Sequence, residues 1–483
     1  MILETNDTIV ALATPPGAGA IAVVRLSGSL AVRLADGIFR GRRLVDCPSH
    51  TAHFGRIVRE DGSTVDEVVA TVFRSPRSYT GEDVVEISCH GSTYLQQELI
   101  QTCLRAGARM AQPGEFTLRA YLNGKMDLSQ AEAVADLIAS ESSASAELAL
   151  KQLRGGFKKE IVRLRERLIE FASLIELELD FSEEDVEFAD RKQLKALVLE
   201  LKRHISSLLS SFQLGNAIKT GVSTVIAGRP NAGKSTLLNA LLNEERAIVS
   251  DIAGTTRDTI EEVLNIHGVQ FRLIDTAGIR EAHDQIEAIG VRKTFEKVRE
   301  ASLLIYVWDI TSGMTLQELY NDLAQLLVNP VHCLVVCNKM DRNPLFDVGW
   351  VLNPADPAIH PYLLPSAPVL VPETLVLSDL VVVPVSASNQ MNIDYLKEEL
   401  YRAALGDSIR LEGTVVTNAR HYDALRRAEG ALEEVLQGLD SGLTGDFIAQ
   451  DIRRSLNFLG EITGEIGVED LLGSIFGKFC IGK

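Results

Sequence analysis

The N-terminal quarter of the chain has the pattern of short strands. Apolar and polar residues alternate there in short runs that Gly and Pro separate, which is typical of half-buried strands joined by turns. One segment, 93–106, instead has the spacing of an amphipathic helix. We therefore predict a small α+β domain, with strands at 8–13, 20–26, 52–58, 65–73 and 84–88.

The pattern changes to long amphipathic helix at Asp127. This residue is a suitable N-cap, and the apolar residues after it recur at helical spacing, at Leu128, Ala131, Val134, Ala135 and Ile138. Further helices are predicted at 151–179 and 191–212 and, nearer the C-terminus, at 395–404, 419–439 and 446–459.

An α/β segment lies between these helical parts, from the apolar run 222–227 to about residue 387. Helical sequence on both sides favours a domain inserted into one helical domain, because domain termini often lie close together. Three domains in series is the alternative, but the last helices alone would form a thin core. The predicted fold class is multidomain: an N-terminal α+β domain (1–124), an α-helical domain in two parts (125–217 and 400–483) and an inserted α/β P-loop domain (218–399).

Composition narrows the class of protein. The 483 residues are 46% apolar and 24% charged, as in globular proteins. A net charge of −18 argues against holding RNA by bulk electrostatic attraction, so contact with RNA would need a local patch or a partner. The N-terminus lacks the features of a signal peptide, and prolines and charges interrupt the apolar segment 365–387. We expect a cytoplasmic protein without a membrane span, whose six cysteines form no C-x-x-C pair and stay reduced.

Residues 228–235, Gly-Arg-Pro-Asn-Ala-Gly-Lys-Ser, follow the run 222–227 and precede a predicted helix at 236–242. This is the phosphate-binding loop G-x-x-x-x-G-K-S in its strand–loop–helix context. Its glycines let backbone N–H groups surround phosphates, and the helix N-terminus adds a positive dipole. We expect Lys234 to reach the β- and γ-phosphates and Ser235 to offer a hydroxyl to magnesium.

Three further motifs follow in the order that a GTPase requires. Asp275-Thr-Ala-Gly278 would place a carboxylate near the magnesium and an amide near the γ-phosphate. In Asn338-Lys-Met-Asp341, the carboxylate of Asp341 would accept both N–H donors of guanine and leave other bases unpaired. Ser386-Ala-Ser388 would contact the guanine carbonyl through a backbone amide. The four motifs together predict a GTPase.

One position departs from Ras-like GTPases. Ile279 stands where those proteins carry the glutamine that orients the attacking water, and no arginine is recognisable as a finger. Another polar group must therefore orient the water, and the transition state needs a further positive charge.

Several other segments match one family. They are Asn231, the run Ser250-Asp-Ile-Ala-Gly-Thr-Thr-Arg-Asp258, Ile279, the end Phe479-Cys-Ile-Gly-Lys483, the start Asp7-Thr-Ile-Val-Ala-Leu-Ala-Thr-Pro-Pro16, and Pro113-Gly-Glu-Phe116. Over nearly its whole length the chain resembles the tRNA modification GTPase MnmE family.

The resemblance implies that a potassium ion supplies the missing charge. Asn231 would be its side-chain ligand, Ser250, Ile252 and Thr255 would complete the shell, and Thr256 would join Ser235 on magnesium. Glu287 would position the attacking water through an intervening group, although by itself it reads as a solvated loop charge. The residues expected to bind GTP are Asn231, Ala232, Gly233, Lys234, Ser235, Thr236, Ser250, Asp251, Ile252, Ala253, Gly254, Thr255, Thr256, Asp275, Thr276, Ala277, Gly278, Asn338, Lys339, Asp341, Ser386, Ala387 and Ser388.

The N-terminal domain resembles a tetrahydrofolate-binding module that dimerises. Arg25, Glu82, Lys125 and the terminal Lys483 match positions that contact a 5-formyl or methylene folate, which suits a ligand with a pterin edge and an anionic tail. Cys480 matches the functional cysteine of the family. From the residues alone, Arg25 and Glu82 are ordinary surface or turn residues, and Cys480 is a small buried one.

The segment between Asp341 and Ser386 departs from the family pattern. It is a long insert, and we expect an irregular surface loop because its prolines remove backbone donors. Ser388 also replaces a lysine often found after Ser-Ala, so the affinity for the base is expected to differ. The prolines are Pro344, Pro354, Pro357, Pro361, Pro365, Pro368 and Pro372.

The resemblance implies a potassium-dependent, homodimeric GTPase. With a flavin-containing MnmG-like partner, in a heterotetramer, it would place a 5-carboxymethylaminomethyl-type group on the wobble uridine of certain tRNAs, using a folate one-carbon unit. One rival, a ribosome-assembly GTPase, would need a basic RNA-binding domain that the acidic flanks do not supply. The other, a folate-dependent transferase without a tRNA target, fits less well with Cys480 and the tail.

Overall fold

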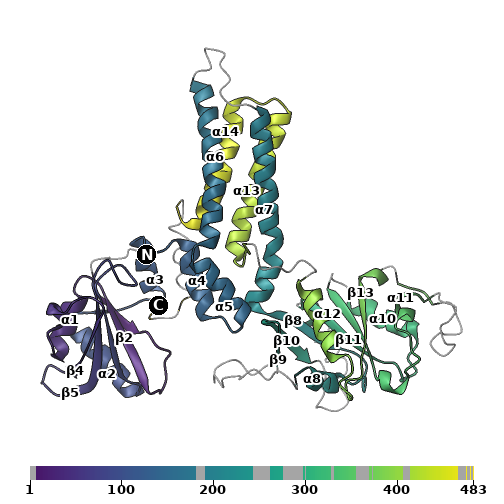
Figure 1. Cartoon of the computed structure of the whole chain (residues 1–483), viewed down its shortest axis with the longest axis horizontal. Helices are drawn as coiled ribbons and strands as arrows, with labels where there is room; N and C mark the ends of the chain where they lie inside the picture. Colours follow the sequence, from purple (N-terminus) through teal and green to yellow (C-terminus); the bar gives the residue numbers. More distant parts are fainter. Residues whose placement is uncertain are drawn as a thin grey trace. The chain divides into compact units, whose positions relative to one another are not determined.

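The structure is a computed structural model, and Figure 1 shows the whole chain. It describes residues 7–180, 191–242, 261–275, 297–299, 301–327, 331–354, 369–372, 374–405, 414–465, 475, 479 and 482. The chain forms two compact units. The first consists of Met1–Ala139, Ala149–Ile205 and Asp423–Lys483, and the second of Ser140–Leu148 and Ser206–Tyr422.

Within the described residues, the N-terminal domain is built on a seven-stranded sheet in the order β3-β4-β5-β6-β2-β1-β7. Neighbouring strands are antiparallel except β1 and β7. The strands are β1 (Ile9–Leu12), β2 (Ile21–Ser27), β3 (Phe39–Gly41), β4 (Thr51–Val58), β5 (Thr64–Phe73), β6 (Val84–His90) and β7 (Arg109–Met110).

Helices cover both faces of this sheet near β1. On one face, Val10 packs in a core with α1 (Ala31–Ile38) and α2 (Thr93–Arg105). On the other face, Ile9 and Ala11 pack against Phe116 of α3 (Glu115–Leu122). Successive side chains of a strand point to opposite faces, so a continuous apolar run such as Ile-Val-Ala-Leu is what a doubly covered strand requires.

The five predicted strands and the helix at 93–106 are all present. The prediction of a single helix in this domain was wrong, because the domain also contains α1 and α3. Helices α1 and α3 were missed, as were β3 and β7. Helix α1 contains Gly37 and lies in a run of turn-like residues, and α3 is a short helix whose N-cap, Gly114, has a left-handed backbone with φ 68°. Tertiary packing rather than a capping signal stabilises both helices.

The helical part begins at α4 (Leu128–Ile138), where Asp127 is the N-cap as predicted. Its Oδ1 accepts from the backbone N–H of Gln130 at 2.9 Å, and the Gln130 side chain accepts the Asp127 N–H at 3.0 Å, which completes a capping box. Further along the chain come α5 (Ser143–Leu153), α6 (Gly156–Asp180), α7 (Arg191–Thr220), α13 (Ala419–Asp440) and α14 (Gly445–Thr463).

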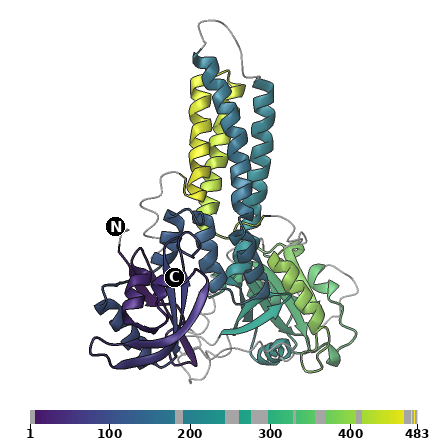
Figure 2. The ribbon, with the colours of Figure 1, turned by 60° about the vertical axis from the view of Figure 1, so that its left-hand side comes forward.

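Helices α6, α7, α13 and α14 lie side by side as a bundle (Figures 1 and 2). Ion pairs join them on the outside, for example Arg167–Glu200 between α6 and α7 and Arg454–Glu434 between α14 and α13. In the part of the chain that the structure describes, no helix is long and apolar enough to cross a membrane.

The second unit contains a six-stranded sheet in the order β13-β12-β11-β8-β10-β9, counted over the described residues. All neighbours are parallel except β9 and β10. The elements are β8 (Val222–Ala227), α8 (Lys234–Leu242), β9 (Glu261–Ile266), β10 (Val269–Asp275), β11 (Leu303–Asp309), α10 (Leu316–Leu326), β12 (His332–Asn338), α11 (Gly349–Leu352), β13 (Leu380–Pro384) and α12 (Ile393–Leu405).

Helices cover both faces of this sheet as well. One core joins Ile226 of β8 to α8 and α12, and a second core joins its neighbour Val225 to α10. Every residue from Leu303 to Trp308 of β11 is buried. Such uninterrupted apolar strands are typical of parallel sheets between two helical layers.

The α/β domain is inserted in the helical domain, as expected. Helix α7 leads into it and α13 leads out, so the segments before and after it belong to the same compact unit. The fold class predicted from the sequence is confirmed, while the boundaries given above for each domain stay a prediction.

The proline-containing insert was expected to be an irregular surface loop. Where the structure describes it, the insert instead contains a short helix, α11, and buried apolar residues. Phe346 and Val351 are buried in the core that contains α10, and Val369 and Val371, each beside a proline, pack against it. Two side chains of α10 hold the insert: Tyr320 Oη donates to Val351 O at 2.8 Å, and the Gln317 amide pairs with both backbone groups of Leu370 at 2.7 and 2.9 Å.

Candidate functional site

Several of the predicted motifs meet at one edge of the six-stranded sheet. The carboxyl ends of β8, β10, β11, β12 and β13 all point to this edge, because these five strands are parallel. Strands β10, β11 and β12 end at Asp275, Asp309 and Asn338, and Gly228 and Val385 directly follow the ends of β8 and β13. Ligands of open α/β sheets bind at this edge.

The loop after β8 needs unusual backbone angles. Gly228 and Gly233 have φ of 147° and 97°, and Asn231 has φ of 61°. A Cβ on Gly228 would lie 2.3 Å from the carbonyl oxygen of Val307, and one on Gly233 would lie 2.3 Å from Asn338 Nδ2. At both positions a larger residue would clash with a neighbour and would also strain the backbone. The motif thus has the geometry of a phosphate-binding loop.

Lys234 begins α8 and is 8% exposed. Its ammonium group donates to the carbonyl oxygens of Gly228 at 2.9 Å and Arg229 at 3.0 Å, so it lies across the inside of the loop. A cation and the N-terminus of a helix are thereby combined at one point, which favours a polyanionic ligand.

Asn338 connects the loop to the two segments expected to bind the base. Its Nδ2 donates to Ala232 O at 2.9 Å, while its Oδ1 accepts from the backbone N–H groups of Lys339 at 2.9 Å and Ala387 at 3.1 Å. The Asn338 residue is buried, at 2% exposed. Its side chain thus fixes the relative positions of three loops.

Lys339 also connects the phosphate-binding loop to the base-binding segment. It does so partly through an ion pair that was not predicted from the sequence. Its ammonium group donates to Asn231 O at 3.1 Å and to Asp309 Oδ2 at 2.5 Å. Burial would raise the pKa of Asp309, but the hydrogen bonds from Lys339 and Thr311 outweigh it and lower the pKa. A carboxylate directly after a buried strand was the available signal for Asp309.

Asp341 lies at the exposed edge of this arrangement. Its Oδ1 accepts from Ser386 Oγ at 2.6 Å, so the Ser-Ala-Ser loop orients the carboxylate. The backbone N–H groups of Ser386, Ala387 and Asn389 are engaged within the protein, by Met391 O, Asn338 Oδ1 and Ser386 O. The amide of Ser388 is therefore the one best suited to a ligand carbonyl.

Arg229 attaches the loop to α10, and this contact was also not predicted. The guanidinium contacts Asp322 at 2.8 and 3.2 Å and Glu318 at 3.0 Å. Hydrogen bonds from the backbone of Thr315 and from Arg229 lower the pKa of Glu318 to about 2. A pocket of about 310 Å³ lies beside this contact, between the loop and Trp308.

Part of the predicted nucleotide site cannot be placed. Ser250, Asp251, Ile252, Ala253, Gly254, Thr255, Thr256, Thr276, Ala277, Gly278, Ile279 and Glu287 lie outside the described residues, as do Cys480 and Lys483. Of Asp275 only the backbone is described, at the end of β10 and in register with Ile226 of β8.

The N-terminal candidate site lies on the sheet face that α3 covers. Arg25 of β2 is paired with Glu86 of β6 at 2.8 Å. Its guanidinium also faces two aromatic rings, with 5.4 Å to the centroid of Tyr79 and 5.6 Å to that of Phe116. Arg25 is therefore held from three sides rather than being an ordinary surface residue.

Glu82 and Lys125 come to the same region. Glu82 accepts from Ser27 Oγ at 2.7 Å, and Ser27 lies two residues after Arg25 on β2, hence on the same face. Lys125 lies over the turn before Glu82: its Cγ and Cδ are each 3.3 Å from the position of a Cβ on Gly81. The structure thus brings the three described folate candidates together.

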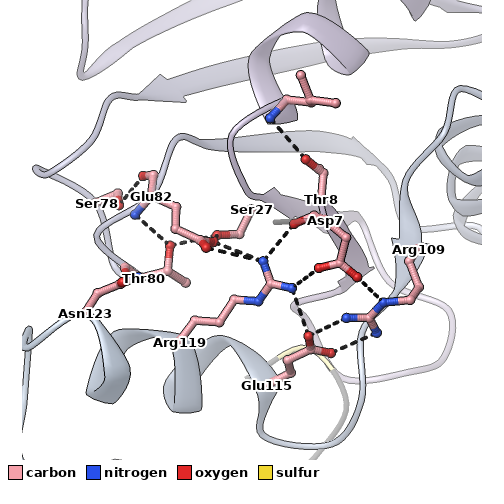
Figure 3. A network of polar contacts seen from close by, with 11 residues as sticks. Asp7, Thr8, Ser27, Ser78, Thr80, Glu82, Arg109, Glu115, Arg119 and Asn123 are labelled. Carbon is pink, nitrogen blue, oxygen red and sulfur yellow. Dashed lines mark hydrogen bonds and ion pairs between the residues drawn. The ribbon is translucent and has the colours of Figure 1, made fainter. Parts of the chain in front are cut away.

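A cluster of charged side chains includes Glu82 (Figure 3). We call it the acid–arginine cluster; it consists of Asp7, Glu82, Arg109, Glu115 and Arg119. Arg119 is 3% exposed and Glu115 is 1% exposed. Burial would raise the pKa values of Asp7 and Glu115, but the hydrogen bonds from both arginines outweigh it and lower them. Only Glu82 had been recognised from the sequence.

The described residues of the C-terminal tail lie against the N-terminal domain. Phe479 packs with Leu118 of α3 and Leu128 of α4. A Cβ on Gly482 would lie 1.9 Å from Leu12 O, so this glycine touches the end of β1. Leu12 is paired with Val24, the neighbour of Arg25. Gly482 therefore lies at the end of β1, the strand next to the one that carries Arg25.

The mainly parallel sheet, the phosphate-binding loop and the guanine-type motif, in which Ser386 orients Asp341, define a P-loop GTPase inserted into a helical domain. Comparison with known proteins refines this class. The MnmE helical domain family matches residues 128–480, and the GTP-binding protein TrmE N-terminus family matches residues 8–125. The chain belongs to the tRNA modification GTPase MnmE family.

Relatives with that name match end to end. The protein from Cytophaga hutchinsonii is 54% identical over 482 residues, which cover 100% of this chain and 99% of that protein. The proteins from Flavobacterium johnsoniae and Christiangramia forsetii are both 50% identical; they cover 99% and 100% of this chain, and 99% and 100% of their own lengths.

Proposed function

We propose that the chain is a potassium-dependent GTPase that acts, as a homodimer and with a flavin-containing MnmG-like partner, on the wobble uridine of certain tRNAs. A reduced folate would supply the one-carbon unit of the new group, and the site of action would be the cytoplasm. GTP hydrolysis would drive association and reopening of the G domains. The family membership supports tRNA as the substrate, and the geometry supports GTP.

One observation carries the GTP assignment. The phosphate-binding loop and the base-binding segment are fastened together by Asn338, whose Nδ2 donates to Ala232 O at 2.9 Å and whose Oδ1 accepts the Ala387 amide. Phosphates over Lys234 and a guanine edge on Asp341 would therefore be held at a fixed separation. A movement of the loop that follows Asn338 would therefore alter the contacts of both the phosphates and the base.

The residues divide the work of hydrolysis. Lys234 and the backbone of the loop would hold the phosphates, Ser235 and Thr256 would hold magnesium, and Glu287 would orient the attacking water through an intervening group. Asn231 suits a cation ligand, because its left-handed backbone and the Lys339 contact fix its position. A potassium ion held there would supply the positive charge that an arginine finger gives elsewhere.

The N-terminal site suits a folate by its donor set. Glu82 is an acceptor for the N–H edge of a pterin, and Arg25 and Lys125 are cations for the anionic tail. The buried Nε of Arg119 has no hydrogen-bond partner among the described residues, which is expected where a ligand or water completes a site. Cys480 and Lys483 would join from the tail.

Nucleoside analysis of tRNA tests the proposal. Wobble uridines would be analysed by mass in a strain that lacks this gene and in strains complemented with the intact gene, Lys234→Met or Cys480→Ser. We expect the modified nucleoside only with the intact gene, because Lys234→Met removes phosphate binding and Cys480→Ser the thiol. Unchanged nucleosides in the deletion strain would remove the tRNA function and leave the folate-dependent transferase as the better reading.

The cation requirement is tested separately on purified protein. GTP hydrolysis should be much faster in potassium than in sodium at equal ionic strength, and Asn231→Ala should remove the difference while GTP binding persists. Equal rates in both salts for the intact protein would contradict the potassium assignment.

A further inference from the structure

Arg119 occupies the centre of the acid–arginine cluster. Its Nη2 pairs with Glu115 at 3.0 Å and with the carboxylate of Asp7, and its Nη1 donates to Asp7 O at 2.9 Å. The same Nη1 reaches both oxygens of Glu82, at 3.3 and 3.4 Å. One buried side chain thereby joins three segments: the residues before β1, the turn before β6, and α3 (Figure 3).

The charges of this cluster do not balance. Its three carboxylates face two guanidinium groups, so one negative charge is left over within the cluster. Arg109 contacts Asp7 and Glu115. Among the described residues, the Glu82 carboxylate accepts one short hydrogen bond, from the Ser27 hydroxyl, and two longer contacts from Arg119. Glu82 is therefore the least tightly paired carboxylate of the cluster, and its side chain is 17% exposed, whereas that of Glu115 is 1% exposed.

Glu82 is thus held in place without being tightly paired. A carboxylate held in this way accepts two parallel N–H donors well, because its direction is fixed while its contacts with Arg119 are long. Asp341 has the same chemistry at the guanine site, where Ser386 Oγ holds the carboxylate at 2.6 Å. The 2-amino-4-oxo edge of a pterin presents the same pair of donors as guanine does.

We propose that Arg119 is a positioning residue that directs the loosely paired carboxylate of Glu82 at the donor edge of a reduced pterin. The proposal rests on the folate function proposed above and deepens it. Arg119 acts through Glu82 and contributes orientation rather than charge alone. Among the described residues, Arg109 contacts Asp7 and Glu115 of this cluster but not the turn that carries Glu82, so we assign it a role in stability.

Matched substitutions separate the two arginines. Full-length Arg119→Lys and Arg109→Lys keep the charge of the cluster and remove the bidentate geometry at one position each. Affinity for 5-formyltetrahydrofolate and for an analogue with a methyl group in place of the 2-amino group would be measured by titration calorimetry. GTP hydrolysis and melting temperature would be followed on the same samples.

We expect Arg119→Lys to weaken binding of the formyl folate at least tenfold and to abolish its preference over the analogue. Arg109→Lys should keep affinity within about twofold and keep the preference, with a comparable fall in melting temperature. Equal losses in both variants, or a loss with the preference intact, would mean that Arg119 is only structural and would overturn the proposal.

Ser27→Ala is the second variant, in case Arg119→Lys does not fold. It removes the other contact of Glu82 and should lower affinity and preference in the same direction, though less; unchanged binding would overturn the proposal. If the intact protein binds neither compound, the folate function itself fails, and that outcome is distinct from failure of the Arg119 proposal.

Discussion

The phosphate-binding loop and the acid–arginine cluster both hold polar groups in fixed directions, but they use different parts of their residues. In the loop, the backbone carries the function: Gly228, Asn231 and Gly233 have positive φ, and Lys234 returns to the loop carbonyls. In the cluster, side chains carry the function, and two of them, Glu115 and Arg119, are buried.

This difference decides how each site fails. A backbone site tolerates little added volume, because a Cβ meets another main chain that cannot move away. A site of buried charges tolerates volume better, but not the loss of one partner, because an unpaired charge then remains in a medium that solvates it poorly. The four predictions below test this contrast.

The largest effect is expected for Gly228→Ala. The left-handed backbone should cost about 1–3 kcal/mol, and the contact with Val307 O about 1–3 kcal/mol more, in the binding of GTP. Titration with a labelled GTP analogue should show at least a roughly thirtyfold loss of affinity. Gly313→Ala is the control, since Gly313 also has positive φ but nothing within 4 Å of its Cβ position. Equal losses in both variants would show that contact with Val307 is unimportant.

Glu115→Gln should destabilise the N-terminal domain by about 3–5 kcal/mol, because two arginines lose a buried partner. Urea denaturation monitored in that domain gives the free energy of unfolding, and GTP hydrolysis should change little. Glu200→Gln breaks the exposed pair with Arg167 and should have no measurable effect. A stable Glu115→Gln protein would indicate that the cluster is not a source of stability.

Asp341→Asn should weaken GTP by about 1.5–3 kcal/mol, since a charge-assisted contact with the base is lost. The variant should gain affinity for xanthosine triphosphate, whose base offers an acceptor where guanine has its amine. Ser386→Ala, which only releases the carboxylate, should have a smaller effect of about 0.5–1.5 kcal/mol. Competition between the two nucleotides measures the change, and an unaltered preference would contradict the role of Asp341.

The smallest effect concerns pH. The folded-state pKa values of Asp7 and Glu115 lie below their ordinary values of 3.8 and 4.5, so the unfolded chain takes up protons first as the pH falls. Their stabilisation is therefore complete above the ordinary values and is lost as the pH falls through the folded ones. The difference in melting temperature between the intact protein and Glu115→Gln should shrink from pH 6 to pH 3. A constant difference would refute the electrostatic origin.

The contrast also explains what the sequence could predict. The residues of the loop are consecutive, so their spacing alone revealed the strand, the turn and Lys234. The partners of Arg119 lie at positions 7, 82 and 115, and no local pattern relates them. Asp309 and Arg229 were missed for the same reason, since Lys339 and Asp322 come near only after the sheet has formed. Helix α3 was missed because tertiary packing, rather than a capping residue, determines where it begins.

The inserted domain has a consequence for synthesis of the chain on the ribosome. Helix α7 pairs through Lys202 with Glu433 of α13, a residue 231 positions later. At roughly 5–20 residues per second, α6 and α7 wait on the order of 10–50 s for the helices that cover them. During that time the G domain between them is completed, while the apolar faces of α6 and α7 stay without their partners. A nascent chain of this architecture should therefore engage a chaperone at its first two bundle helices, whereas a permuted gene that keeps the four helices contiguous should not.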